Sequence, residues 1–310
     1  MSDILVTGGA GFIGTNICKS ALDRGYSVRV LDDFSTGSSM NLAGLEVEIL
    51  QGDVTNPDCV RKAAQGVKYV FHEAAASSSS MFTPYPNRGI EVNVLGFANV
   101  LSASVEAKAE KVVYAMTSSM YGNLATPWKE EALRIQDVPN VYGSSLLDRF
   151  YIARQIERTL KLKTAGLVYF SVYGPHEKSK KGYANVVTQF LWSIMRGQRP
   201  VLYGDGTQRR DFVYVEDVVR ANFLAAESEF SDDFVNVGTG TSHSMMEVAE
   251  MLCHKIDGRV KPICVPNPIY GYSNHTLADT SKAEALLHFK AKVKLTEGLN
   301  RLIEFYTHEC

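Results

Sequence analysis

A glycine-rich turn that joins an apolar strand to a helix is the feature that most constrains the fold. It reads VTGGAGFIG over residues 6–14, and Gly8, Gly11 and Gly14 stand three residues apart. Glycine at such positions allows a tight turn, a close approach of the backbone to a diphosphate, and close packing of the helix on the sheet. The start of the helix also offers N–H groups and the positive end of its dipole to phosphates. We therefore expect a dinucleotide-binding unit here, although a plain strand–helix turn would explain the glycines taken alone.

The first two-thirds of the chain alternates between strand-like and helix-like segments. Short runs rich in Val, Ile and Leu, as expected of strands buried on both faces, occupy residues 4–7, 27–31, 47–50, 69–71, 112–115 and 167–170. Helix-length stretches lie between them at 12–24, 57–64, 90–107 and 142–161. This alternation predicts an α/β fold with a doubly wound parallel sheet. Beyond Gly174 the pattern is less regular, with helices expected at 184–196, 245–256 and 296–306 and a strand at 234–237.

Composition excludes several classes of partner. The net charge of −2 gives no basic field for nucleic acid, and no apolar run is long enough to span a membrane. The chain opens without the cationic segment of a signal peptide. The five cysteines form no CxxC pair, and no cluster of His, Cys, Asp and Glu has metal-ligand spacing. We expect a globular cytoplasmic protein that binds no nucleic acid, membrane or metal.

Two carboxylates follow predicted strands where a dinucleotide would lie. Asp32 ends the second strand, 18 residues after Gly14. Its carboxylate can accept two hydrogen bonds from the hydroxyls of an adenosine ribose and would repel a 2′-phosphate, which favours NAD over NADP. Asp53, in GDV (52–54), ends the third strand, where it either contacts the adenine or caps a loop.

Motifs along nearly the whole chain resemble those of one enzyme family. They are TGGAGFIG (7–14), LDDF (31–34), GDV (52–54), FHEAAA (71–76), NVLG (93–96), VVYAMTSSMYG (112–122), YFSVYGPH (169–176), YGDGTQRRDFVYVEDVV (203–219), NVGTG (236–240) and ADTSKA (278–283). Together they resemble the extended short-chain dehydrogenase/reductase family, of the nucleotide-sugar epimerase type. The resemblance implies an NAD-binding Rossmann domain over residues 1–170 and about 209–238, and a smaller nucleotide-sugar-binding domain over 171–208 and 239–310. It places the cofactor-binding residues at Gly8, Gly11, Phe12, Ile13, Gly14, Asp32, Asp53, Val54, Ala74, Ala75, Asn93 and Tyr142.

The same resemblance assigns proton transfer to Tyr142 and Thr117. In the family, a tyrosine takes the proton of a sugar hydroxyl while NAD accepts a hydride, and a Ser or Thr hydrogen-bonds that hydroxyl. A lysine four residues after the tyrosine binds the nicotinamide ribose and lowers the tyrosine's pKa by its charge, but here that residue is Leu146. Leu146 can do neither, and an apolar neighbour raises the pKa of a phenol. Arg149 lies on the same side of the helix but two turns away, about 10 Å, so we do not expect it to replace the lysine.

Substrate contacts are implied at Thr117, Ser118, Ser171, Asn185, Arg210 and Thr276. Arg210 matches a family arginine whose guanidinium fork grips the diphosphate of the sugar nucleotide. Many relatives carry an R-x-G-D stretch before the ADTSKA motif, with a second diphosphate ligand. Ile269 and Tyr272 stand there in this chain, so the grip on the diphosphate is weaker or differently arranged. Thr276 stands where some epimerases have a large aromatic residue, and it leaves room for an N-acetylated sugar.

Two serines after Thr117 bear on the type of reaction. Related 4,6-dehydratases carry an Asp–Glu pair at these positions, and related decarboxylases carry a glutamate at the second. Ser118 and Ser119 cannot supply that acid–base chemistry. We therefore predict NAD-dependent 4-epimerisation of a UDP-hexose (UDP-glucose/UDP-galactose or the N-acetyl forms) through a 4-keto intermediate. Leu146 leaves open a catalytically disabled nucleotide-binding protein, and another nucleotide-sugar epimerase or oxidoreductase is a third reading.

The remaining features carry weaker expectations. The helices at 90–107 and 144–161 are apolar widely around their surface, and in the family they pair across a two-fold axis, which implies a homodimer. We interpret His72 as a packed residue near the cofactor, and His176 and His275 have no assigned role. The lysines of EKSKKG (177–182) are interpreted as a solvated loop.

Overall fold

The structure, a computed structural model, describes residues 2–82, 85–267 and 273–308. Its centre is a seven-stranded sheet in the order β10-β6-β5-β4-β1-β2-β3, and every neighbouring pair is parallel. The strands are β1 (Ile4–Thr7), β2 (Val28–Asp32), β3 (Val47–Gln51), β4 (Tyr69–His72), β5 (Lys111–Thr117), β6 (Lys163–Tyr169) and β10 (Asp233–Val237). The predicted doubly wound parallel sheet is confirmed, with boundaries that shift by a few residues.

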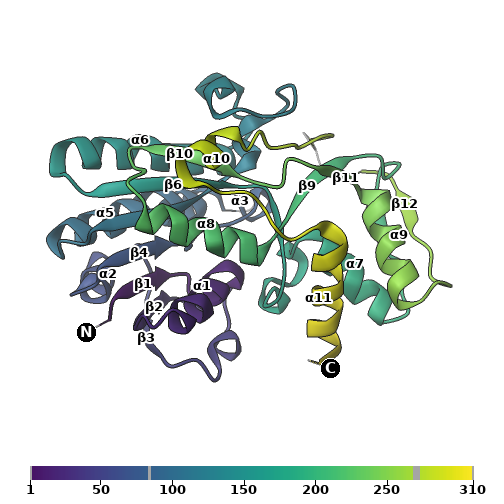
Figure 1. Cartoon of the computed structure of the whole chain (residues 1–310), viewed down its shortest axis with the longest axis horizontal. Coiled ribbons are helices and arrows are strands. Elements are labelled where there is room, and N and C mark those ends of the chain that lie inside the picture. The colour runs from purple at the N-terminus through teal and green to yellow at the C-terminus, as the bar shows by residue number, and fades with distance from the viewer. Residues whose placement is uncertain (1, 83–84, 268–272, 309–310) are drawn as a thin grey trace.

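Helices cover both faces of this sheet (Figure 1). On one face α1 (Phe12–Asp23) and α8 (Val215–Glu227) pack together over Val6, Val113 and Val235. On the other face α2 (Pro57–Ala64), α5 (Phe97–Glu106) and α6 (Val141–Leu160) pack over Leu5, Val70 and Val112. Adjacent residues of one strand thus enter different cores, which explains why these strands are apolar throughout.

A smaller group of elements lies at one end of the sheet, on the right of Figure 1. Helices α7 (Val186–Met195), α9 (Met245–Ile256) and α11 (Leu295–His308) share an apolar core that includes Leu191, Leu252 and Leu299. A sheet of β7 (Ser171–Tyr173), β9 (Arg209–Tyr214) and β11 (Ser242–Ser244) lies with this group. A two-stranded pair, β8 (Val201–Tyr203) and β12 (Ile263–Val265), completes it, and α10 (Ser281–Leu287) packs on β10 and α8.

The sequence prediction missed or simplified several elements. It did not anticipate α8, α10 or the short strands β7, β8, β9, β11 and β12. The helix predicted over 90–107 begins earlier, because α4 (Pro86–Ile90) leads into a π-helical turn at Glu91–Gly96 and then into α5. Within that turn the carbonyl of Asn93 accepts a hydrogen bond from the Arg149 guanidinium. Such π turns occur often at functional sites.

Candidate active site

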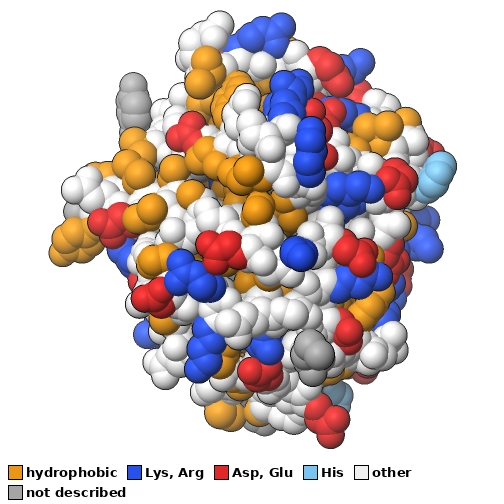
Figure 2. Space-filling model, turned by 90° about the vertical axis from the view of Figure 1, so that its left-hand side faces the viewer, with side chains coloured by type: hydrophobic (Ala, Val, Ile, Leu, Met, Phe, Trp, Pro, Cys, Tyr) orange, Lys and Arg blue, Asp and Glu red, His pale blue; other side chains and the backbone are white. Residues whose placement is uncertain are grey.

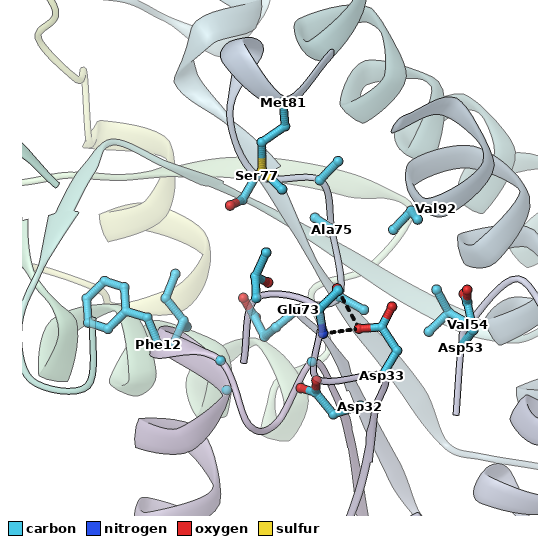
Figure 3. Close-up of a pocket in the computed structure, with 18 of the residues that line it drawn as sticks. Phe12, Asp32, Asp33, Asp53, Val54, Glu73, Ala75, Ser77, Met81 and Val92 are labelled. Carbon is cyan, nitrogen blue, oxygen red and sulfur yellow. Dashed lines mark hydrogen bonds between the residues drawn. The ribbon is translucent and has the colours of Figure 1, made fainter. Parts of the chain in front are cut away.

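A cavity of about 390 Å³ opens at the carboxyl ends of β1, β2 and β4. The chain order of the sheet reverses between β1 and β4, and ligands of doubly wound folds bind at such a switch point. Figure 3 shows Phe12 on one side of the cavity, Asp53 and Val54 on the other, and Asp32 and Asp33 at its base. Ten predicted cofactor residues line it: Gly8, Gly11, Phe12, Ile13, Gly14, Asp32, Asp53, Val54, Ala74 and Ala75.

The glycine turn leaves no space for side chains. A Cβ atom on Gly14 would stand 2.2 Å from the carbonyl oxygen of Gly8, and one on Gly8 would stand 2.7 Å from the Ala74 nitrogen. Gly8 also has a φ of 71°, which favours glycine. The N-cap of α1 is Gly11, which has no side chain to cap the helix, so the first N–H groups of α1 are available for phosphates. These features fit the diphosphate of a dinucleotide.

Asp32 is fixed at the base of the cavity. Its two carboxylate oxygens accept hydrogen bonds from the backbone N–H groups of Ala10 (2.9 Å) and Phe34 (2.8 Å). Burial raises the pKa of Asp32, and these two N–H groups oppose that effect. Each oxygen keeps a second lone pair for a ribose hydroxyl.

Asp53 both lines the cavity and caps a loop, so the two interpretations of it are compatible. It accepts a hydrogen bond from the Thr55 N–H (2.8 Å) and forms an ion pair with Arg88. Arg88 also lies 3.7 Å from Asp33, so it joins two acidic residues at this end of the cavity. The sequence analysis did not single out Arg88.

The predicted catalytic residues Thr117 and Tyr142 lie near each other. Neither is among the described residues that line the cavity. Thr117 ends β5 and Tyr142 lies in the first turn of α6, where the Thr117 side chain is near enough to influence the phenol. Both are buried, with 7% and 9% of their surfaces exposed. Burial raises the pKa of Tyr142, while the neighbouring Thr117 side chain and the charge of Arg149 lower it. The balance is a phenol with a raised pKa.

Leu146 fills the position of the family lysine with an apolar contact. It is buried in a small cluster with Tyr142 and Phe82, the last residue of α3 (Ser79–Phe82). The Phe82 and Tyr142 rings are 5.8 Å apart, centroid to centroid. The site of the missing cation is thus a packed apolar environment.

Asn93 holds the loop that follows β4 in place. Its side chain accepts a hydrogen bond from the Ala76 N–H (2.8 Å) and donates to the Ala76 carbonyl (3.2 Å) and the Ser145 hydroxyl (3.0 Å). It is fully buried and positions the residues that line the cavity. Asn93 itself is not one of the described residues that line the cavity.

Glu73 is a lining residue that the sequence analysis passed over. It directly follows β4, and its carboxylate accepts a hydrogen bond from the Tyr169 hydroxyl (2.8 Å), which in turn accepts one from the Asn222 amide (2.8 Å). Burial raises the pKa of Glu73 to about 7. A carboxyl that titrates near neutral pH inside a cavity is a frequent mark of a functional site.

The cavity also receives two residues from the less regular part of the chain. Lys180 and Tyr183 line it, and the Lys180 ammonium lies 5.7 Å from the centre of the Phe12 ring. The lysine loop was interpreted as solvated, so the contact of Lys180 with the cavity was missed. No pattern in EKSKKG distinguishes this lysine from its neighbours.

The predicted substrate residues lie in several elements. Thr276 lies beside the strand that carries Arg210. It donates its N–H to the Arg209 carbonyl (3.1 Å), and its hydroxyl accepts from the Asp211 N–H (3.3 Å). Asn185 caps α7, accepting from the Val187 N–H (3.0 Å). Ser118 follows β5 and Ser171 opens β7. Ile269 and Tyr272 lie outside the described residues.

The histidines have structural surroundings. His72 is fully buried against Phe97 and hydrogen-bonds Thr7 (2.8 Å). His176 packs on Phe305, and burial lowers its pKa to about 4. His275 hydrogen-bonds Thr126 (3.1 Å) and Ser242 (3.0 Å). Within residues 2–82, 85–267 and 273–308 no cluster could hold a metal ion, and no helix there has the length and apolarity to cross a membrane.

Comparison with known proteins identifies the family. Residues 4–238 match the model of the NAD dependent epimerase/dehydratase family. The chain belongs to this family. Its cofactor is accordingly NAD, as the glycine turn and Asp32 predicted.

Individual members of the family differ in their reactions. The chain is 32% identical to a putative UDP-glucose 4-epimerase of Methanocaldococcus jannaschii and 30% identical to a UDP-N-acetyl-alpha-D-glucosaminuronate decarboxylase of Bacillus cytotoxicus, in each case over 97% of both chains. The crystal structure of a Thermotoga maritima UDP-glucose 4-epimerase with UDP-glucose is 30% identical and superposes with a TM-score of 0.91 over 99% of both chains. These similarities support an epimerase-like enzyme and leave its own reaction open.

Proposed function

We propose that this protein is a nucleotide-sugar 4-epimerase that uses bound NAD to interconvert UDP-hexoses, or their N-acetyl forms, through a 4-keto sugar. The observation that carries the proposal is that Thr117 and Tyr142 are buried near each other, while the two residues after Thr117 in the sequence are Ser118 and Ser119. The pair can bind and deprotonate a sugar hydroxyl. The serines provide no acid and base for the elimination or decarboxylation that some relatives perform.

The residues of the cavity suit the parts of NAD. The glycine turn and the start of α1 would hold the diphosphate, and Asp32 would accept from the adenosine ribose. Lys180 would add a positive charge on the open side. NAD, when bound, supplies reversible oxidation and reduction at a sugar carbon.

The protein's own contribution to the chemistry is proton transfer. Tyr142 would hold the proton of the sugar 4-hydroxyl while the 4-keto sugar turns over, and would then return it. Thr117, whose side chain lies near the phenol, would orient it and the sugar hydroxyl. An ordinary phenol is only about 0.1% ionised at pH 7, so a phenol with a raised pKa makes a slow base.

One observation favours a second candidate, a nucleotide-sugar-binding protein without turnover. Leu146 lacks the lysine's charge, and it also packs with Phe82 and Tyr142 into an apolar cluster that shields the phenol from water. This candidate predicts that NAD and a UDP-sugar bind while no epimer forms.

We propose that residues 171–208 and 239–310 bind the nucleotide sugar, with Arg210 on its diphosphate. Arg210 is 9% exposed and lies on β9, between β7 and β11. Thr276 beside it would border the sugar. The support is the meeting of these segments at one place in the fold.

We also propose a homodimer formed through α5 and α6. Leu95, in the π turn before α5, and Tyr151 of α6 are 51% and 46% exposed, which is unusual for such large apolar side chains. Figure 2 shows hydrophobic side chains gathered on one face of the molecule among charged ones. Light scattering would report twice the 34.2 kDa chain mass for a dimer.

Exposed Cys264 and three other free cysteines among the described residues suit the cytoplasm.

The experiment that tests the function is product analysis. Purified protein would be incubated with UDP-glucose, UDP-galactose and their N-acetyl forms, beside a Tyr142→Phe variant, and the sugars followed by NMR. The proposal expects 4-epimers from the wild type and none from the variant. Bound NAD without any epimer would support the second candidate.

A further inference from the structure

Arg149 is a fully buried cation near the predicted base. It lies on α6, seven residues after Tyr142, and none of its surface is exposed. Its guanidinium donates hydrogen bonds to three backbone carbonyls: Asn93 (2.9 Å), Ala115 (3.0 Å) and Ala74 (2.9 Å). Ala115 stands two residues before Thr117, and Ala74 lines the cavity. The charge therefore sits at the same edge of the sheet as the catalytic pair.

No carboxylate forms a salt bridge with Arg149 in the described part of the chain. Glu73 is the acid that its charge influences most, but Glu73 is hydrogen-bonded to Tyr169, and its pKa of about 7 leaves it only partly ionised at neutral pH. A buried guanidinium is costly unless its donors are satisfied. Here three carbonyls satisfy the donors without cancelling the charge.

The surroundings transmit this charge instead of screening it. Leu146 is apolar and buried, and the ring of Phe97 lies 5.5 Å from the guanidinium carbon. In such surroundings the effective dielectric constant is well below that of water, and a charge acts over a longer distance. Long helical side chains also lean toward the N-terminus of their helix. In agreement with this, the Arg149 Nε donates to the carbonyl of Asn93, and the Asn93 amide donates to the Ser145 hydroxyl, which lies in the turn of α6 between Arg149 and Tyr142. The Ser145 hydroxyl in turn donates to the Tyr142 carbonyl.

We propose that Arg149 takes the electrostatic role of the lysine that this chain lacks at position 146, so that its buried positive charge favours the phenolate of Tyr142. This proposal rests on the proposed function in treating Tyr142 as the base. Arg149 is a positioning residue, since it acts through Tyr142 and through the Ala74 loop. The helix has leucine at the buried position of the family lysine, and it carries a buried cation one turn further along the same side.

Several titratable groups face this charge from the elements around it. They are Tyr142 on α6, Tyr114 on β5, Tyr169 on β6, and His72 and Glu73 at the end of β4. Arg149 lowers the pKa of each of these groups, and among them Tyr142 is the one whose pKa the Thr117 side chain also lowers. A test must therefore isolate Tyr142 from the other groups.

The experiment measures the ionisation of Tyr142 without any sugar. Tyrosine absorbance would be titrated in NAD-loaded protein, and the curve of the matching Tyr142→Phe version subtracted each time. Leu146→Lys serves as the background variant. Its ammonium should lower the pKa of Tyr142 into a pH range in which the protein stays folded, so that the phenol can be titrated. Arg149→Met is compared in that background with Lys111→Met. Lys111 is also a buried cation that donates to three carbonyls (Ala225, Ser228 and Phe230). It stands at the first residue of β5, at the opposite end of this strand from Thr117.

The proposal expects Arg149→Met to raise the midpoint of Tyr142 by about one unit, a tenfold change in ionisation. Lys111→Met should leave that midpoint unchanged. An unchanged midpoint in Arg149→Met, or equal shifts in both variants, would overturn the proposal. Because no sugar is present, this result is independent of whether the protein is an epimerase.

A charge-conserving variant covers the case in which Arg149→Met does not fold. Arg149→Lys keeps the positive charge with fewer donors. The proposal expects its midpoint to stay at that of the parent while stability falls. A midpoint that moves by about a unit with the charge still present would show that Arg149 acts through packing, and would overturn the proposal.

Discussion

Phe82 packs against Tyr142 with ring centroids 5.8 Å apart and ring planes inclined at 54°. With Leu146 this contact encloses the phenol that we propose as the catalytic base. Burial is the largest cause of the raised pKa of Tyr142. If Tyr142 is the base, as we propose, its ionisation depends on how the chain offsets the apolar environment of this hydroxyl.

Leu146→Lys should restore the family arrangement. The new ammonium lies one turn from Tyr142 and should lower its pKa by about 1–3 units, so turnover at pH 7 should rise at least about tenfold. The variant should also lose stability without NAD, because an ammonium enters an apolar cluster. Turnover and thermal melting with and without NAD check both effects. Unaltered turnover in a folded, NAD-bound variant would mean that base ionisation does not limit the reaction.

Phe82→Ala should uncover Tyr142. Removing the ring lets water reach the phenol, so the pKa of Tyr142 should fall, while the loss of a buried aromatic costs about 3 kcal/mol. Phe82→Leu, which keeps an apolar cover, is the matched control and should change the pKa much less. Titration of the phenol and denaturant unfolding measure the two effects. A higher pKa in Phe82→Ala would contradict this account of the cluster.

Gly14→Ala should weaken the binding of NAD. Its Cβ would meet the Gly8 carbonyl at 2.2 Å, so the turn must shift and NAD affinity should fall at least about tenfold, or 1.4 kcal/mol. Gly258→Ala is the control, since a Cβ there meets no atom within 4 Å. Calorimetric titration with NAD compares the two variants. Equal affinities would show that the turn tolerates a side chain.

Glu73 should make stability depend on pH near neutrality. Burial raises its pKa in the folded state to about 7, above the ordinary value of 4.5, so the folded protein binds more protons than the unfolded chain between these values. Its contribution to stability is then full below about pH 4.5 and is lost as the pH rises through 7. Glu73→Gln should flatten the decline between pH 5 and 8 in denaturant unfolding. Glu130, whose pKa burial also raises to about 7, remains in both proteins, so the difference isolates Glu73. Parallel curves for the two proteins would contradict the assignment.

Whether a feature could be predicted from the sequence depended on whether its physical cause leaves a pattern in neighbouring residues. The strands of the parallel sheet and the glycine turn were predictable, because burial on both faces and close backbone contact leave a local pattern. The strands β7 and β11 were missed, since three-residue strands have no period to detect. The strand β9 was missed because its six residues, RRDFVY, show no alternation of apolar and polar side chains. The contacts of Arg149 and Lys180 were not predictable for another reason. Their surroundings come from segments distant in sequence, the Ala74 loop for one and the glycine turn for the other.

The central claim is that one sugar carbon is oxidised and reduced again within a single site. The most direct measurement follows UDP-glucose deuterated at C4 as it is incubated with the NAD-loaded protein, with NMR of the products. The account predicts UDP-galactose that retains deuterium at C4. Loss of deuterium to solvent, a dehydrated or decarboxylated product, or no product from either this sugar or its N-acetyl form would contradict it.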